Sequence, residues 1–84
     1  MLKVLFFARI REELDCPGLE LPWDPAVADL DALQEQLAGE HGQRWREVLG
    51  RDNTIRAVNQ TVITGNSPLR DGDEVAFFPP VTGG

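Results

Sequence analysis

The sequence has few of the residues that carry most enzyme chemistry. Its 84 residues include one cysteine (Cys16), one histidine (His41) and one serine (Ser67). A single cysteine excludes an internal disulfide and a cysteine-rich zinc site, and it is typical of a protein from a reducing cytoplasm. Neither a glycine-rich phosphate loop nor a nucleophile–base pair is present. We therefore expect a chain with no self-sufficient active site that binds no metal or cofactor.

Positive charge and long apolar runs are also scarce. Fourteen acidic residues face eight basic ones, the net charge is −6, and Lys3 is the only lysine. This balance argues against nucleic-acid binding, which needs clustered lysine and arginine, and it suits basic protein partners. The apolar start of the chain lacks a signal-peptide cleavage pattern, and no stretch is long enough to span a bilayer. We expect no membrane partner.

The residues that are present predict one α+β domain. Asp29 is a natural N-cap, and apolar residues recur at helical spacing up to Gly39, so Asp29–Gly39 is predicted as the main helix. Short helical turns are expected at 10–14 and 43–49. Strands are predicted at residues 2–8, 19–21, 55–58, 61–64 and 74–78, with a tight Asn59-Gln60 turn between the third and the fourth. This order predicts a β-grasp fold, a mixed five-stranded sheet packed on one main helix.

The alternation of side chains along a strand divides the phenylalanines between two faces. If the helix covers the face that carries Phe6 and Phe77, together with their alternate neighbours, then Phe7 and Phe78 lie on the open face. An exposed apolar patch on so small a domain is typical of a partner surface. Val62 is a third candidate for this surface. The alternative is that Phe7 and Phe78 are tucked under a loop.

Three polar features are better explained by structure than by chemistry. Cys16 has no base nearby in the sequence to activate it, and His41, placed just past the helix, has no second metal ligand. The acidic run Asp71–Glu74 lacks calcium-loop spacing and is interpreted as a solvated turn.

The C-terminus has an unusual design. Pro79 and Pro80 end the last strand and hold the chain extended, and the sequence closes on Gly83-Gly84. The six residues from Pro79 can reach about 20 Å. Glycines carry no Cβ, so this end can pass through a channel that any side chain would block. The α-carboxylate of Gly84 is itself a chemical group, which another enzyme could activate with ATP as an acyl adenylate. We expect a domain at 1–78 and an extended tail at 79–84.

The residues of this C-terminal segment also carry a family resemblance. The run Asp71–Gly84, with its Phe-Phe-Pro-Pro-Val-Thr-Gly-Gly ending, resembles the C-terminus of the small subunits of molybdopterin synthase. Val4–Ala8 and Ala57–Gln60 resemble the same family in the right order, and the resemblance covers essentially the whole chain. It is loosest over residues 15–52, where Trp23 has no counterpart.

The resemblance implies a ubiquitin-like sulfur carrier. In that family an ATP-dependent adenylyltransferase activates the terminal glycine, here Gly84, and a sulfur donor protein converts the adenylate to a thiocarboxylate. The tail, here Val81, Thr82 and Gly83 before Gly84, then enters the large subunit of a heterotetramer. There it donates sulfur to cyclic pyranopterin monophosphate in molybdenum cofactor biosynthesis. Phe7, Val62, Phe78, Pro79 and Pro80 would form the partner interface.

Other functions use the same tail. The chain could be a sulfur carrier for thiazole synthesis or tRNA thiolation, or a ubiquitin-like protein modifier. A third class is a pure interaction module whose tail is inert. The acceptor of the tail separates these hypotheses.

Overall fold

The computed structural model describes residues 1–80, so the tail residues Val81, Thr82, Gly83 and Gly84 lie outside the described part of the chain. The elements follow the predicted order. They are β1 (Leu2–Phe6), α1 (Ala8–Leu14), β2 (Gly18–Leu21), the 3₁₀ turn η1 (Pro25–Val27), α2 (Leu30–His41), α3 (Gln43–Leu49), β3 (Ile55–Val58), β4 (Thr61–Ile63) and β5 (Glu74–Phe78).

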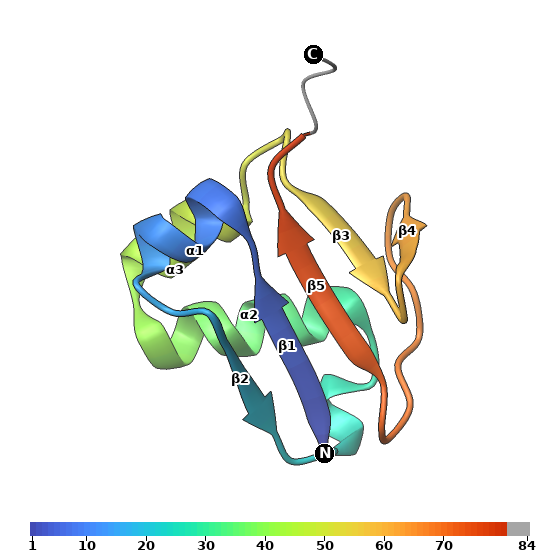
Figure 1. Ribbon diagram of the computed structural model, residues 1–84. Coiled ribbons are helices and arrows are strands. Elements are labelled where there is room, and N and C mark those ends of the chain that lie inside the picture. The colour runs from blue at the N-terminus through green and yellow to red at the C-terminus, as the bar shows by residue number, and fades with distance from the viewer. Residues whose placement is uncertain (81–84) are drawn as a thin grey trace.

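The five strands form one mixed sheet in the order β2-β1-β5-β3-β4. β1 and β5 are parallel at the centre, and the other neighbours are antiparallel. Asn59 and Gln60, both with positive φ (49° and 69°), form the predicted turn between β3 and β4. Figure 1 shows α2 crossing one face of the sheet, with α1 and α3 beside it. The predicted β-grasp architecture is confirmed.

Local sequence explains the main helix. The carboxylate of Asp29 accepts a hydrogen bond from the backbone N–H of Ala32 at 2.8 Å, which is the predicted N-cap. Leu30, Leu33 and Leu37 are fully buried because their spacing gives α2 a single apolar stripe. The helix continues to His41, two residues beyond the prediction, and Gly42 at φ 101° ends it.

The first strand is shorter than the predicted residues 2–8. It ends at Phe6, and the carbonyl of Phe7 accepts hydrogen bonds from the N–H groups of Ile10 and Arg11, which opens α1. Ile10 and Leu14 lie four residues apart and are both buried. The burial of this pair favours a helix where β-forming sequence alone suggested more strand.

The core lies between the covered face of the sheet and the three helices. Phe6 stacks with Phe77 at a centroid separation of 5.8 Å and meets Trp45 edge to face at 5.2 Å. Val4 and Val75 are fully buried on the same face. Each fully buried side chain of this size contributes about 1.5–3 kcal/mol, so these central strands and Trp45 contribute much of the domain's stability.

Candidate interface at the root of the C-terminal tail

β5, the central strand, leads into the tail at one edge of the sheet, the edge formed by the ends of the strands. β1 ends at that same edge because it runs parallel to β5, and Phe7 extends the ladder by one bond from its N–H to the carbonyl of Phe77, at 3.2 Å. On the other side Ile55, at the start of β3, pairs with Phe78. Figure 1 shows the end of β5 and the start of β3 together at the top of the view, with the end of β1 below them. We call this place, where Phe78 passes into Pro79 and Pro80, the tail root.

The face of the sheet away from the helices is the open face, and its register places the predicted apolar residues together. Leu5 pairs with Ala76, Ala76 with Ala57, and Ala57 with Val62, so one row of aliphatic side chains crosses four strands. A second row, toward the tail root, consists of Phe78 and Ile55. Both rows lie on one side because directly paired residues share a face.

The exposure of this face differs from that of the core. Phe7 is 45% exposed and Val62 is 60% exposed, whereas Phe78 and Pro79 are half-buried and Pro80 is exposed. Exposed aromatic and aliphatic side chains on one face of a sheet fit a docking surface. The alternative that Phe7 is tucked under a loop is wrong. The part that these residues play in a partner interface stays a prediction.

The three polar features explained by structure keep structural roles. The Cys16 thiol donates to the carbonyl of Gly18 at 3.4 Å, and the ring of His41 stacks on Trp45 at 3.9 Å. The Asp73 carboxylate accepts from the backbone N–H of Arg70 at 2.8 Å and from the side chain of Asn59 at 2.9 Å. Within residues 1–80, no three His, Cys, Asp or Glu side chains group in a way that could hold a metal ion. Nor is any helix there long and apolar enough to cross a bilayer.

A groove of about 530 Å³ beside the tail root was not predicted from the sequence. Its walls come from three separate parts of the chain: the start of α1, the loop between α3 and β3, and the tail root. They are Ala8, Arg9, Ile10, Glu12, Arg51, Asn53, Thr54, Pro79 and Pro80. No sequence signal joins these segments, because only the parallel pairing of β1 with β5 brings α1 to the tail root.

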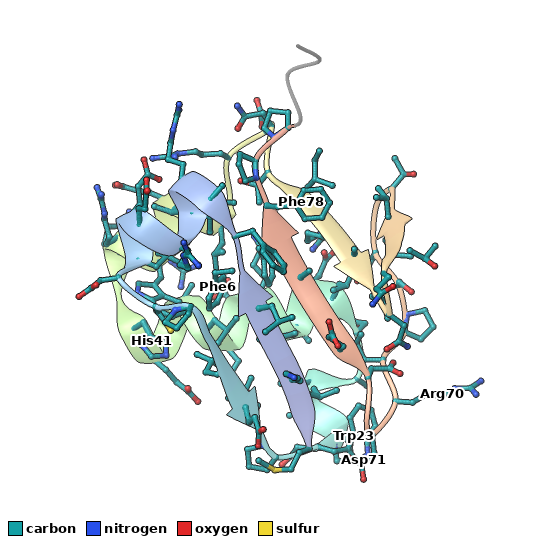
Figure 2. The ribbon with its side chains drawn as sticks, viewed as in Figure 1. Phe6, Trp23, His41, Arg70, Asp71 and Phe78 are labelled. Carbon is teal, nitrogen blue, oxygen red and sulfur yellow. The ribbon has the colours of Figure 1, made fainter. Side chains whose placement is uncertain are left out.

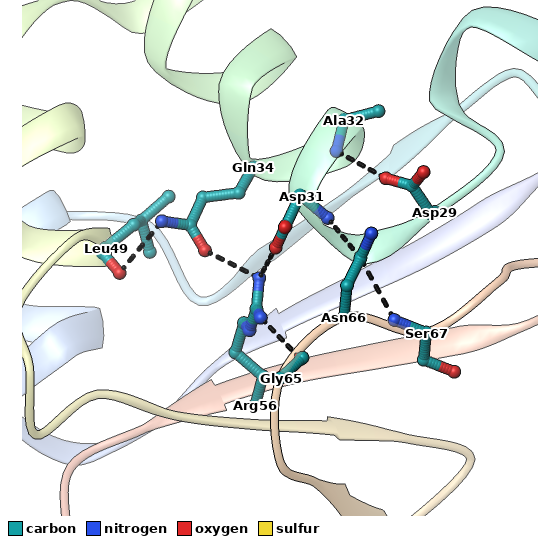
Figure 3. A network of polar contacts seen from close by, with 9 residues as sticks. All are labelled: Asp29, Asp31, Ala32, Gln34, Leu49, Arg56, Gly65, Asn66 and Ser67. Carbon is teal, nitrogen blue, oxygen red and sulfur yellow. Dashed lines mark hydrogen bonds and ion pairs between the residues drawn. The ribbon is translucent and has the colours of Figure 1, made fainter.

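A second polar feature, on the covered side, also went unpredicted. Arg56 of β3 reaches α2, where its guanidinium donates to Asp31 at 2.8 Å and to Gln34 at 3.2 Å, and it donates to the carbonyl of Gly65 at 2.6 Å. Figure 3 shows this network between the helix and the loop after β4. It ties β3 and the loop after β4 to α2.

The fold first defines the class, that of ubiquitin-like β-grasp proteins. Small archaeal modifier protein 1 from Methanosarcina acetivorans superposes with a TM-score of 0.77 over 99% of this chain and 95% of that chain. The two are 23% identical, and at that level the likeness concerns the fold alone.

Sequence similarity then gives the family. The model of the ThiS family matches residues 4–84, and the chain belongs to that family. A molybdopterin synthase sulfur carrier subunit from Escherichia coli K12 is 47% identical over 85 residues, with 100% of both chains covered. A structure of the complex of subunits 1 and 2 of molybdopterin-converting factor from Helicobacter pylori 26695 contains a similar chain. It has a TM-score of 0.68 and is 31% identical, with 99% of this chain and 97% of that chain covered.

Proposed function

We propose that this chain is the sulfur carrier subunit of a molybdopterin synthase. The observation that carries the proposal is the layout of the C-terminal end. A central strand leads directly into Pro79-Pro80 at a sheet edge with exposed apolar side chains, and the sequence continues to Gly83-Gly84. The 47% identity to a subunit of that name over the whole chain supports it.

The chemistry of the carrier follows from its C-terminal carboxylate. An ATP-dependent adenylyltransferase would join the carboxylate of Gly84 to the α-phosphate of ATP and release pyrophosphate. Sulfur from a donor protein would then displace AMP and leave a thiocarboxylate. The thiocarboxylate sulfur is the nucleophile toward cyclic pyranopterin monophosphate. The dithiolene needs two sulfurs, which suits two carriers and two large subunits in a heterotetramer.

In this proposal the carrier, the activating enzyme and the large subunit contribute different groups. The carrier is not an enzyme by itself and binds no cofactor, and ATP is used by the activating enzyme. The large subunit supplies the cationic groups that receive the anionic tail and substrate, because this chain has a net charge of −6. Val81, Thr82 and Gly83 thread the channel. Phe7, Val62, Phe78, Pro79 and Pro80 dock around it. The single cysteine suits the reducing cytoplasm.

The test is the intact mass of the full chain before and after incubation with ATP, a sulfur source and the activating enzyme. We expect a mass gain equal to one oxygen replaced by one sulfur, localised by fragmentation to Gly84. The charged chain should then convert cyclic pyranopterin monophosphate when mixed with the large subunit. A chain without Gly84 is the control; if it still supports conversion, the proposal is wrong. Charging without conversion would favour a thiazole or tRNA acceptor. Adducts with target lysines that survive denaturation and reductant would favour a protein modifier.

A further inference from the structure

The groove beside the tail root offers a site that the carrier function alone does not explain. Pro79 and Pro80 form one of its walls, so the groove lies beside the place where a partner would receive the tail. A volume of about 530 Å³ holds a side chain together with part of its loop. Asn53 and Thr54, in the loop between α3 and β3, also line the groove.

The charges in the groove select the chemistry of its occupant. Arg51 is paired with Glu13 at 2.6 Å, so its charge is already compensated. Arg9 is exposed and forms no side-chain hydrogen bond or ion pair with any residue of the described part of the chain, not even with Glu12 one helical turn away. Arg9 is therefore the cation that the groove presents to a partner.

The contrast with the other arginines sharpens this point. Arg46 and Arg56 are, like Arg51, each paired with a carboxylate, at 2.7 and 2.8 Å. Among the arginines that form no ion pair within residues 1–80, Arg9 lines the groove, whereas Arg11, Arg44 and Arg70 do not. Planar guanidinium groups bind carboxylates through two parallel hydrogen bonds, which gives direction as well as attraction.

We propose that this groove receives an acidic side chain of the large subunit, with its carboxylate on Arg9, when the tail enters that subunit. The inference rests on the proposed function. It assigns the large subunit as the occupant because a relative's structure is a complex of subunits 1 and 2 of molybdopterin-converting factor. This contact lies beside the start of α1, whereas Phe7 and Phe78 lie on the open face of the sheet. The tail root is thus held from two sides, and Arg9 acts as a positioning residue for the tail.

The experiment is titration calorimetry of the full chain with its large subunit, comparing Arg9→Gln with Arg70→Gln. Arg70 is exposed and lies at the opposite end of the molecule from the tail root, as Figure 2 shows. Each variant removes one positive charge, so the pair controls for net charge. We expect Arg9→Gln to weaken binding about tenfold and Arg70→Gln to change it less than about twofold. We also expect Arg9→Lys to recover part of the loss, and the affinity of Arg9→Gln to depend less on salt than that of the wild type.

Each other outcome overturns the inference in its own way. Equal effects of the two glutamine variants would mean that only net charge matters. Tighter binding by Arg9→Gln would mean that the groove holds the chain's own terminal segment until the partner displaces it. If Arg9→Gln binds the large subunit like the wild type but loses affinity in a parallel titration with the activating enzyme, the groove belongs to that partner instead. If the wild type does not bind the large subunit at all, the proposed function fails, and thermal melts of every variant show whether the domain is still folded.

Discussion

Two pairs of neighbouring phenylalanines show how differently the two faces of one sheet are used. Phe6 and Phe77 pair across the central strands and are 1% and 0% exposed, against Trp45 and the helices. Their neighbours point to the other face, where Phe7 is 45% exposed and Phe78 is half-buried. The residue type is the same, and only the alternation of the strand separates them. The covered face stabilises the domain, while the open face keeps Phe7 and Val62 exposed.

The largest effect on stability is expected from Phe77→Ala, on the covered face. Removing a fully buried phenylalanine leaves a cavity beside Phe6, so we expect the free energy of unfolding to fall by about 3–5 kcal/mol. That is a large part of the stability of a domain this small. Urea denaturation followed by circular dichroism measures it. A loss as small as that of Phe78→Ala would mean that the two faces do not differ in packing.

Arg56→Met tests the polar part of the covered side. The methionine keeps the aliphatic contacts, but the hydrogen bonds to Asp31, Gln34 and Gly65 are lost. The Arg56 side chain is 17% exposed, whereas that of Asp31 is 63% exposed, so the partner carboxylate can return to water. We expect a loss of about 1–2 kcal/mol in the same denaturation assay. Arg70→Met, at an exposed site, is the matched control and should change stability little. An unchanged free energy of unfolding in Arg56→Met would show that these hydrogen bonds do not stabilise the fold.

Phe78→Ala tests the open face of the sheet in the same way. Its side chain is only half-buried, so we expect a smaller loss, about 1 kcal/mol of unfolding free energy. Binding to the large subunit should weaken at least about tenfold, because aromatic side chains, phenylalanine included, are enriched at the cores of protein interfaces. Calorimetry and thermal melts on the same samples separate the two effects. A large fall in melting temperature with unchanged affinity would place Phe78 in the core.

The smallest effect is expected on the outer surface of the helices, at Glu35. A hydrogen bond from Arg46, together with its charge, lowers the pKa of the Glu35 carboxyl below its ordinary value. The pair therefore stabilises the fold at neutral pH, and its contribution disappears as the pH falls through the lowered pKa. Both side chains are exposed and screened by solvent, so Glu35→Gln should shift the melting temperature at neutral pH only slightly. At a pH below that pKa the melting temperatures of variant and wild type should coincide. A large difference that persists in acid would contradict an electrostatic origin.

Much of the fold was predictable because its signals are local. The cap at Asp29, the apolar stripe of α2 and the turn at Asn59-Gln60 each depend on residues within a few positions of one another. The alternation that separates Phe77 from Phe78 is local as well. The predicted end of the first strand at residue 8 was wrong, because the burial of Ile10 and Leu14 against the core, a tertiary effect, decided that β1 ends at Phe6.

The candidate interface divides in the same way. The Gly-Gly ending and the two prolines are written in the sequence, and so is the absence of an internal nucleophile–base pair. The sequence does not predict that Arg9, Asn53 and Pro79 meet in one groove, because these residues are far apart along the chain and no periodic pattern connects them. The order of the strands and of the main helix, the two faces of the sheet and the chemistry available at Gly84 follow from the sequence alone. That Arg9 lies beside Pro79 and Pro80 follows only from the fold, because the parallel pairing of β1 with β5 sets the start of α1 beside the end of β5.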